Sequence, residues 1–315
     1  MRYLSVCSGI EAASLAWEPL GWAPVAFSEI DPAPAAVLAH HWPQVPNLGD
    51  MTRFEEWPDA AIDILVGGTP CQSFSVAGLR KGLDDPRGNL MLVFGGIARR
   101  YRPEWLVWEN VPGVLSSNGG RDFGAFLGML GELGYGFAYR ILDAEYFGLA
   151  APRARVFVVG HRGDWRCAAA VLLERHAMQG NPAPGGTARL EGSRTLTSAA
   201  PHGRGDAHPI VPCWWDGGQR AQTSDAVLHK QQTMPDKRRF PALIDRLWLR
   251  FCTPREWERM MGIPDNHTLV PYRGRPMKDA PRYKMIGNSM AVPVLRWIGE
   301  RIAAVSGIGH AEVAA

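Results

Sequence analysis

The sequence predicts an α/β protein with a doubly wound, mostly parallel sheet and a smaller irregular domain. Up to residue 160, short apolar runs alternate with segments of helical apolar spacing, a pattern typical of strand–helix–strand units. Glycines and turn residues bound the runs, as expected for strands buried on both faces. Residues 180–218 are instead rich in Gly, Pro, Ser and Thr and lack sustained periodicity. A chain of 315 residues can bury one large core and still form a second domain.

The first expected strand is Tyr3–Cys7, and Gly9 after it precedes apolar residues at helical spacing that end near Gly21. The alternation continues with strands over 24–28, 62–66, 105–108 and 155–159, and with helices over 33–41, 89–101 and 123–133, the last leading into the apolar segment 135–142. We therefore expect three parts: 1–162, an irregular 163–245 with one helical patch at 168–176, and 246–315. In the last part regular signals return at Leu247, and a helix over about 291–305 closes the chain.

The composition is that of a soluble globular protein, with 46% hydrophobic and 21% charged residues. We expect a cytoplasmic protein without a membrane partner, because no apolar stretch approaches a membrane span and the N-terminus lacks a basic region before an apolar core. The five cysteines are scattered, and no pair has metal-ligand spacing, so neither a metal site nor a disulfide framework is predicted. Four of them are interpreted as small buried hydrophobic residues: Cys7, Cys167, Cys213 and Cys252.

Charge is distributed unevenly along the chain. Residues 151–290 contain 22 Lys and Arg against 12 Asp and Glu, a net +10, whereas the rest contains 12 against 19, a net −7. A basic region of this size suits a bound polyanion. Compositional bias on a solvated surface explains it equally well, so charge alone leaves both interpretations open.

Cys71 has neighbours that set it apart from the other cysteines. It lies in the loop Gly67–Ser75, directly after the expected buried strand over 62–66. Open α/β sheets bind ligands beyond the carboxyl ends of their strands, which favours a nucleophile over packing. The expected strand 105–108 runs into Glu109, which places an acid beside the thiol if the two strands are neighbours.

Pro70-Cys71-Gln72, followed by Glu109-Asn110-Val111, resembles the DNA cytosine-5 methyltransferase family of bacterial or phage type. The resemblance extends from about Leu4 to the helix after Asn288 and excludes roughly 163–245. It implies a Rossmann-like methyltransferase domain that binds the cofactor over 1–162, a target-recognition segment over 163–245, and a return to the catalytic domain over 246–315. Two further elements match: Arg250 to Glu256 resembles the family's Arg-x-x-Thr-Pro-x-Glu, with proline starting a helix, and Gly287-Asn288-Ser289 resembles its Gly-Asn-Ser.

The resemblance implies S-adenosylmethionine as the cofactor. A glycine loop and the start of a helix after the first strand suit a nucleotide cofactor, although Glu11 and Ala12 stand where the family commonly has glycines. Glu29 follows the second strand, where Rossmann-like sites bind ribose hydroxyls. Asp50 is either a helix cap or, as in the family, a contact to the adenine amino group. The cofactor residues implied are Cys7, Ser8, Gly9, Ile10, Glu29, Ile30, Asp50, Met51, Pro70, Leu90, Asn288 and Ser289.

The implied chemistry starts with addition of the Cys71 thiolate to cytosine C6, which activates C5 toward the methyl group. Glu109, held as an acid, would hydrogen-bond or protonate N3. Arg153 and Arg155 are two residues apart on the expected strand, so their side chains face the same way. They form either a phosphate clamp or a surface pair. The family pattern assigns Arg155 to cytosine O2 and Arg153 to supporting the site, although Ala151 replaces the usual preceding glutamine.

Duplex DNA is the implied partner, with the cytosine flipped out of the helix. Residues 73–88 are either a solvated basic loop or a segment that closes over the DNA. The segment 163–245 should choose the target, and its basic residues are interpreted as phosphate contacts or surface residues more than as base readers. The DNA-binding candidates are Gln72, Ser75, Arg80, Lys81, Arg87, Arg194, Arg204, Arg220, Lys237, Arg238 and Arg239.

Alternatives remain open at this point. One is a cytosine-5 methyltransferase of RNA such as tRNA, and another is a catalytically dead DNA-binding homologue. An unusual sulfonium cofactor is a third. The family also suggests a monomer in a restriction-modification setting, with a cognate restriction endonuclease as a candidate partner.

Overall fold

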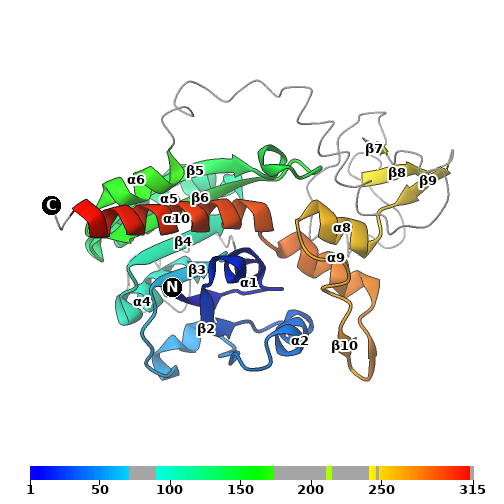
Figure 1. The fold of residues 1–315 in the computed structure, drawn as a ribbon, viewed down its shortest axis with the longest axis horizontal. Coiled ribbons are helices and arrows are strands. Elements are labelled where there is room, and N and C mark those ends of the chain that lie inside the picture. Colours follow the sequence, from blue (N-terminus) through cyan, green and yellow to red (C-terminus); the bar gives the residue numbers. More distant parts are fainter. Residues whose placement is uncertain (71–89, 174–210, 215–240, 246–247, 313–315) are drawn as a thin grey trace. The chain divides into compact units, whose positions relative to one another are not determined.

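The computed structural model describes residues 1–70, 90–173, 211–214, 241–245 and 248–312 (Figure 1). Contacts between residues group the chain into two compact units. Unit 1 comprises the described residues of Met1–Leu142, Ala154–Gly180 and Leu295–Ala315. Unit 2 comprises those of Asp143–Arg153 and Asn181–Val294. The division expected from sequence into 1–162, 163–245 and 246–315 stays a prediction.

Unit 1 is built on a six-stranded sheet in the order β2-β1-β3-β4-β6-β5. The pairs β1–β2, β1–β3 and β3–β4 are parallel, and β4–β6 is antiparallel. The strands are β1 (Arg2–Val6), β2 (Ala23–Ser28), β3 (Ile64–Gly67), β4 (Trp105–Asn110), β5 (Tyr135–Asp143) and β6 (Ala154–Arg162). This confirms the predicted α/β class with a mostly parallel sheet.

Helices follow the strands in the predicted alternation. They are α1 (Ala12–Trp17), α2 (Pro32–His41), α4 (Leu90–Tyr101), α5 (Arg121–Glu132), α6 (Trp165–Leu172) and α10 (Val292–Glu312), with 3-10 turns η1 (Glu18–Leu20), η2 (Met51–Glu56) and η5 (Pro112–Gly120). No helix among the described residues combines the length and the apolar character needed to cross a bilayer.

The sheet is covered on both faces, as the alternation of side chains along β1 shows. Leu4 and Val6 pack into a core cluster with residues of α4 and α5, among them Phe94. Tyr3 points to the opposite face, where its ring packs nearly perpendicular to that of Trp17 of α1, with the ring centroids 5.2 Å apart. Neighbouring residues of a strand point to opposite faces, so two separate apolar layers enclose the sheet.

Two strands differ from the prediction in ways that matter for the site. β4 extends to Asn110, so Glu109 lies inside a buried strand and not beyond its end. β6 continues through Gly160 to Arg162, because the missing side chain at Gly160 leaves room for Leu106 on β4. β6 begins at Ala154, so Arg153 precedes the strand on which the sequence had placed it.

Unit 2 contains three small elements that the sequence did not predict. They are the antiparallel sheet of β7 (Val211–Trp214), β8 (Pro241–Asp245) and β9 (Trp248–Phe251), the hairpin of β10 (Pro271–Tyr272) and β11 (Arg275–Pro276), and the helix α9 (Asp279–Asn288). The turn η6 (Ala144–Phe147) belongs to the same unit.

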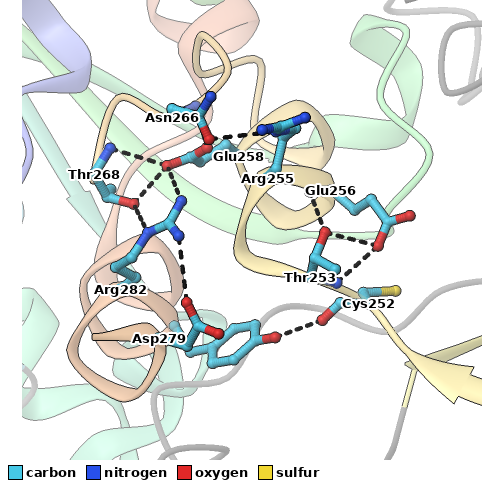
Figure 2. A network of polar contacts seen from close by, with 10 residues as sticks. Cys252, Thr253, Arg255, Glu256, Glu258, Asn266, Thr268, Asp279 and Arg282 are labelled. Atoms are coloured by element: carbon cyan, nitrogen blue, oxygen red, sulfur yellow. Dashed lines mark hydrogen bonds and ion pairs between the residues drawn. The ribbon is translucent and has the colours of Figure 1, made fainter. Parts of the chain in front are cut away.

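The helix α8 (Pro254–Met260) of unit 2 starts at proline as predicted. Thr253 and Glu256 form a reciprocal capping box at its first turn, which satisfies two backbone N–H groups that the helix leaves unbonded. Behind it, Glu258 and Arg282 join α8, the following loop and α9 in one buried polar network (Figure 2). Unit 2 is thus held together by polar contacts as well as by apolar packing.

Candidate functional site

Four parallel strands bring their carboxyl ends together at one edge of unit 1. Gly67, the last residue of β3, pairs with Val6 on one side and Trp108 on the other. A Cβ atom at Gly67 would lie 2.5 Å from Val6 Cγ2 and 2.7 Å from the Val6 carbonyl oxygen. Glycine is therefore required for β3 to approach β1 this closely, and the strand ends meet where ligands of open α/β sheets bind.

Glu109 and Arg155 form an ion pair across β4 and β6 near this edge. The distance from Arg155 Nε to Glu109 Oε1 is 3.1 Å, and the exposed fractions of the side chains are 15% for Arg155 and 11% for Glu109. A second nitrogen of the guanidinium donates to the carbonyl of Ala154 at 2.8 Å, which fixes the plane of the group. Desolvated charges so close interact more strongly than they would in water. The structure thus brings together two of the predicted catalytic residues.

Thr69, on the exit from β3, is anchored by two side chains of β4. Trp108 Nε1 donates to Thr69 Oγ1 at 3.0 Å, and Asn110 Nδ2 donates to the Thr69 carbonyl at 2.9 Å. Both bonds are buried, and Thr69 itself is only 3% exposed. The strand that carries Glu109 therefore also fixes the backbone two residues before Cys71.

The contacts among Thr69, Trp108 and Asn110 were not predicted from the sequence. The only available signal was that Asn110 belongs to the same motif as Glu109. Which donor would reach which acceptor depends on the parallel register Val66–Val107 and Gly67–Trp108, which a sequence alone does not provide.

The loop after β1 is held against β2 by serine and glutamate side chains. Glu29 accepts from the backbone N–H of Gly9 at 2.9 Å and from that of Asp31 at 2.7 Å. Ser8 Oγ accepts from the Ser28 N–H at 3.1 Å. Gly9 has a φ of +57°, which glycine adopts without steric cost. These contacts bring the predicted residues Ser8, Gly9 and Glu29 together at the edge where a nucleotide cofactor is expected.

Other predicted cofactor residues border the same loop. Ile30 is 71% exposed although it is apolar, which suits a flat ligand face. Asp50 caps η2 through one oxygen, Oδ1, which accepts from the N–H and the hydroxyl of Thr52 at 2.9 Å each. The helix-cap interpretation is thus correct, and the second oxygen of the carboxylate leaves an acceptor for a ligand. Ile10 is fully buried in the core.

The Cys7 thiol is not a second nucleophile. Its Sγ lies 3.4 Å from the sulfur of the buried Met51. Burial, reinforced by the negative charges of Glu29 and Asp50, raises the pKa of Cys7 to about 12. Since the thiolate is the reactive form, Cys7 stays inert near neutrality.

Glu11 is a buried carboxylate where the sequence had only marked a departure from glycine. It has a φ of +62°, caps α1 by accepting from the Ser14 N–H at 3.1 Å, and accepts from Ser5 Oγ at 2.8 Å. Burial raises the pKa of Glu11 to about 7, although the hydrogen bonds from Ser5 and Ser14 act in the opposite direction. These bonds offset the strain of a non-glycine residue with a left-handed backbone conformation.

In unit 2, Arg153 contacts the end of α9. Its Nη2 donates to the carbonyls of Gly287 at 3.1 Å and Ser289 at 2.6 Å, and its side chain is buried. Asn288 is the last residue of α9 and Ser289 its C-cap, so the Gly-Asn-Ser segment ends one helix and does not merely precede another. Arg153 and Arg155 thus have different partners, which corrects the expectation of a matched pair on one strand.

Several predicted residues lie outside the described part of the chain. Pro70 is described and exposed, and Leu90 is the half-buried first residue of α4. Outside the described residues lie Cys71, Gln72, Ser75, Arg80, Lys81, Arg87, Arg194, Arg204, Arg220, Lys237, Arg238 and Arg239.

The model of the C-5 cytosine-specific DNA methylase family matches residues 1–183 and 214–304. The chain belongs to this family. Its members take the methyl group from S-adenosylmethionine, and the acidic and apolar residues that follow β2 fit such a ligand: Glu29 offers carboxylate acceptors for hydroxyl groups, and Ile30 an exposed apolar face.

Curated relatives of the chain are named methyltransferases. A protein of Escherichia phage P1 named DNA N-6-adenine-methyltransferase is 32% identical, over 95% of this chain and 61% of its own length, so the chain spans less than two thirds of that relative. The Type II methyltransferase M.HpaII of Haemophilus parainfluenzae is 28% identical, over 95% of this chain and 88% of its own.

Solved structures show the same fold. A DNMT2 mutant of Spodoptera frugiperda aligns with a TM-score of 0.63 and 18% identity, covering 96% of this chain and 99% of that one. The Dnmt2 methyltransferase of S. pombe aligns with a TM-score of 0.65 and 14% identity, covering 96% and 98%. At these identities the likeness speaks for the fold alone.

Proposed function

We propose that the protein methylates C5 of a flipped cytosine in duplex DNA, with Cys71 as the covalent nucleophile. The observation that supports this best is the Glu109–Arg155 ion pair next to the anchored Thr69 at the carboxyl ends of β3 and β4. Thr69 is two residues from Cys71, so the thiol and the acid belong to adjacent strand ends. A nucleophile and an acid so placed suit attack on a polarised ring.

The reaction assigns a role to each of these groups. The Cys71 thiolate adds to C6, and the electron pair of the C5–C6 double bond becomes available at C5. Glu109, which is ion-paired with Arg155 in the structure, takes up a proton for this step and donates it to N3 as the ring takes up negative charge, while Arg155 faces the ring oxygen O2. After C5 has gained the methyl group, it loses its proton to a base, the double bond re-forms, the thiolate leaves, and N3 returns its proton to Glu109. S-adenosylmethionine, when bound, supplies an electrophilic methyl group.

Cytosine suits this site better than adenine does, in spite of the name of the phage P1 relative. The N6 atom of adenine is an exocyclic amine that can attack a methyl group by itself. C5 of cytosine is a weak nucleophile until C6 has been attacked, so it needs both a thiol and an acid. Cys71 and Glu109 supply this pair.

Duplex DNA is favoured over RNA by the family model, which is that of a DNA methylase, and by relatives such as M.HpaII that are named Type II methyltransferases. The net charge of +10 in residues 151–290 suits either polyanion. RNA is the second candidate, because the chemistry at C5 is the same for a cytosine of RNA. Target choice by 163–245, a monomeric state and a cognate endonuclease stay predictions.

The test is methyl transfer from tritiated S-adenosylmethionine to duplex DNA, with a tRNA transcript in a parallel reaction. We expect label on cytosine in DNA, no turnover for Cys71→Ser, and unchanged cofactor binding by calorimetry. Cys167→Ser is the matched control, because Cys167 lies on α6 and not at the strand ends. Turnover by Cys71→Ser would refute the covalent mechanism, and label on tRNA alone would refute the DNA assignment. Bisulfite sequencing of DNA from expressing cells would then identify the target.

A further inference from the structure

The β10–β11 hairpin of unit 2 presents cations at its exposed tip. Its strands pair Pro271 with Pro276 and Tyr272 with Arg275, and the two residues between them form the turn. Arg273 and Arg275 are both exposed. The guanidinium of Arg273 lies over the Tyr272 ring, 5.1 Å from its centroid, so the charged group and an aromatic face are presented together.

The local charge is strongly positive. Residues 271–284 contain five Lys and Arg against one acid, Asp279. Asp279 is engaged with Arg282, from whose Nη1 it lies 3.3 Å, at the start of α9. The cations at the tip are therefore not neutralised by the acid of their own segment.

The turn adopts a backbone that its first residue does not favour. Arg273 has a φ of +51° and Gly274 a φ of +76°, as in a two-residue turn with both central residues left-handed. Asn, Asp or Gly is preferred at the first position, because a larger side chain is strained there. An arginine kept in a strained backbone conformation points to a role for its side chain.

The base of the hairpin is fixed, so the tip is held in place. The Met277 N–H donates to the Val270 carbonyl at 2.9 Å, closing the hairpin beyond its two short strands. Val270 is 1% exposed and Met277 is 3% exposed, so both residues flanking the hairpin are in the core of unit 2. A rigid support of this kind lowers the conformational entropy lost when the arginines bind a ligand.

We propose that the β10–β11 hairpin binds the phosphate backbone of duplex DNA through Arg273 and Arg275. Guanidinium groups bind phosphates through paired hydrogen bonds and are suited to this task. Exposed cations on a fixed turn position a duplex without reading its bases. The inference rests on the proposed function in one respect only, that the substrate is duplex DNA.

Arg273→Asn tests the inference without damaging the turn, because Asn tolerates the left-handed conformation better than Arg. Binding of the full-length protein to a fluorescent duplex is measured by anisotropy over a range of KCl concentrations. We expect roughly fivefold weaker binding and a plot of log K against log[KCl] that is shallower by about 1, the value for one lost phosphate contact. Arg273→Asn combined with Arg275→Gln should lower the slope by about 2.

Arg102→Asn is the matched control. Arg102 is also exposed and left-handed, with a φ of +48°, and its replacement removes the same charge. It lies between α4 and the start of β4, at the opposite edge of the sheet from the candidate site. The control should bind DNA like the wild type. Hairpin variants that bind DNA like Arg102→Asn would overturn the inference.

Two further outcomes separate this inference from the proposed function. If the wild type binds duplex DNA through the hairpin but transfers no methyl group, the proposed function fails and the inference stands. If the wild type methylates DNA while the hairpin variants bind it unchanged, the inference alone fails. Loss of binding to a tRNA transcript with unchanged binding to the duplex would overturn the assignment to DNA.

Discussion

Both units contain a buried glutamate–arginine pair, and the two pairs are built differently. In unit 2, Glu258 is 0% exposed and accepts from the N–H groups of Asn266 at 2.7 Å and Thr268 at 2.9 Å, with Arg282 at 3.3 Å (Figure 2). In unit 1, Glu109 meets Arg155 on the neighbouring strand, at the edge where strands end. The first carboxylate fixes a loop, whereas the second lies where a ligand of an α/β sheet binds.

The difference shows that burial of a charge pair does not define its role. Backbone donors bond to Glu258 and tie α8 to the loop before α9, so removal of its charge leaves the buried Arg282 with the more exposed Asp279 as its remaining acidic partner. The Glu109–Arg155 pair joins two strands that the backbone ladder already holds together. We therefore expect Glu258 to matter for stability and Glu109 for turnover.

Glu109→Gln gives the largest expected effect. Methyl transfer to DNA should fall about 10³-fold, since the amide cannot donate a proton to the cytosine ring. This corresponds to about 4 kcal/mol in the activation barrier. The rate is measured as tritium released from DNA labelled at cytosine C5. The urea unfolding midpoint should change less than in Glu258→Gln, because the backbone ladder between β4 and β6 holds the two strands together without the ion pair.

Glu104→Gln is the matched control for this variant. Glu104 precedes the first residue of β4 and pairs with His161 at 3.3 Å, at the opposite end of the strand from Glu109. Its replacement should leave the rate unchanged. Equal loss of activity in both variants would mean that charge on β4, and not a proton donor at its end, is what turnover requires.

Glu258→Gln should give the opposite result. Replacement of one partner of a buried pair costs about 3–5 kcal/mol, so the free energy of unfolding by urea should fall by that amount. Glu258→Gln combined with Arg282→Met removes both charges and should regain part of the loss. Glu300→Gln on the exposed face of α10 is the control. A Glu258→Gln protein of normal stability but low activity would contradict the assignment of Glu258 to stability and Glu109 to turnover.

The sequence predicted the regular part of unit 1 because buried parallel strands leave a clear apolar pattern. It predicted less of unit 2. β10 and β11 have two residues each, which is too short for any periodicity, and Arg273-Gly274 lacks the Asn or Asp typical of such turns. Helix α9 was missed because its sequence is mostly polar and contains Pro281.

The site was predicted in a similarly uneven way. Cys71, Glu109 and Arg155 could be recognised because a motif names them. The bonds from Trp108 and Asn110 to Thr69 could not, because they depend on which strands are neighbours and in what register. For Glu11 the sequence showed only a missing glycine. Its hydrogen bonds from Ser5 and Ser14 depend on the folded conformation of the turn, which the sequence does not reveal.

Glu11 sharpens the comparison, because within the described part of the chain its hydrogen bonds come from hydroxyl and N–H groups and not from an arginine. Its pKa is raised to about 7 in the folded protein from a usual value near 4.5, chiefly by burial. Between about pH 4.5 and 7 the folded chain keeps a proton that the unfolded chain has released. The contribution of Glu11 to the free energy of unfolding therefore decreases as the pH rises through this window, and then levels off.

Glu11→Gln removes this titration while keeping the shape of the side chain. The amide oxygen can accept from Ser14, and the amide nitrogen can donate to the Ser5 hydroxyl. The stability of the wild type relative to the variant should fall by about 3 kcal/mol between pH 4.5 and 7.5, as measured by urea unfolding. Glu132→Gln on the exposed face of α5 should keep the wild-type pH dependence. If the curves of unfolding free energy against pH are parallel for the wild type and Glu11→Gln, the carboxylate stays charged in the folded protein. Hydroxyl and N–H donors can then stabilise a buried charge without an arginine.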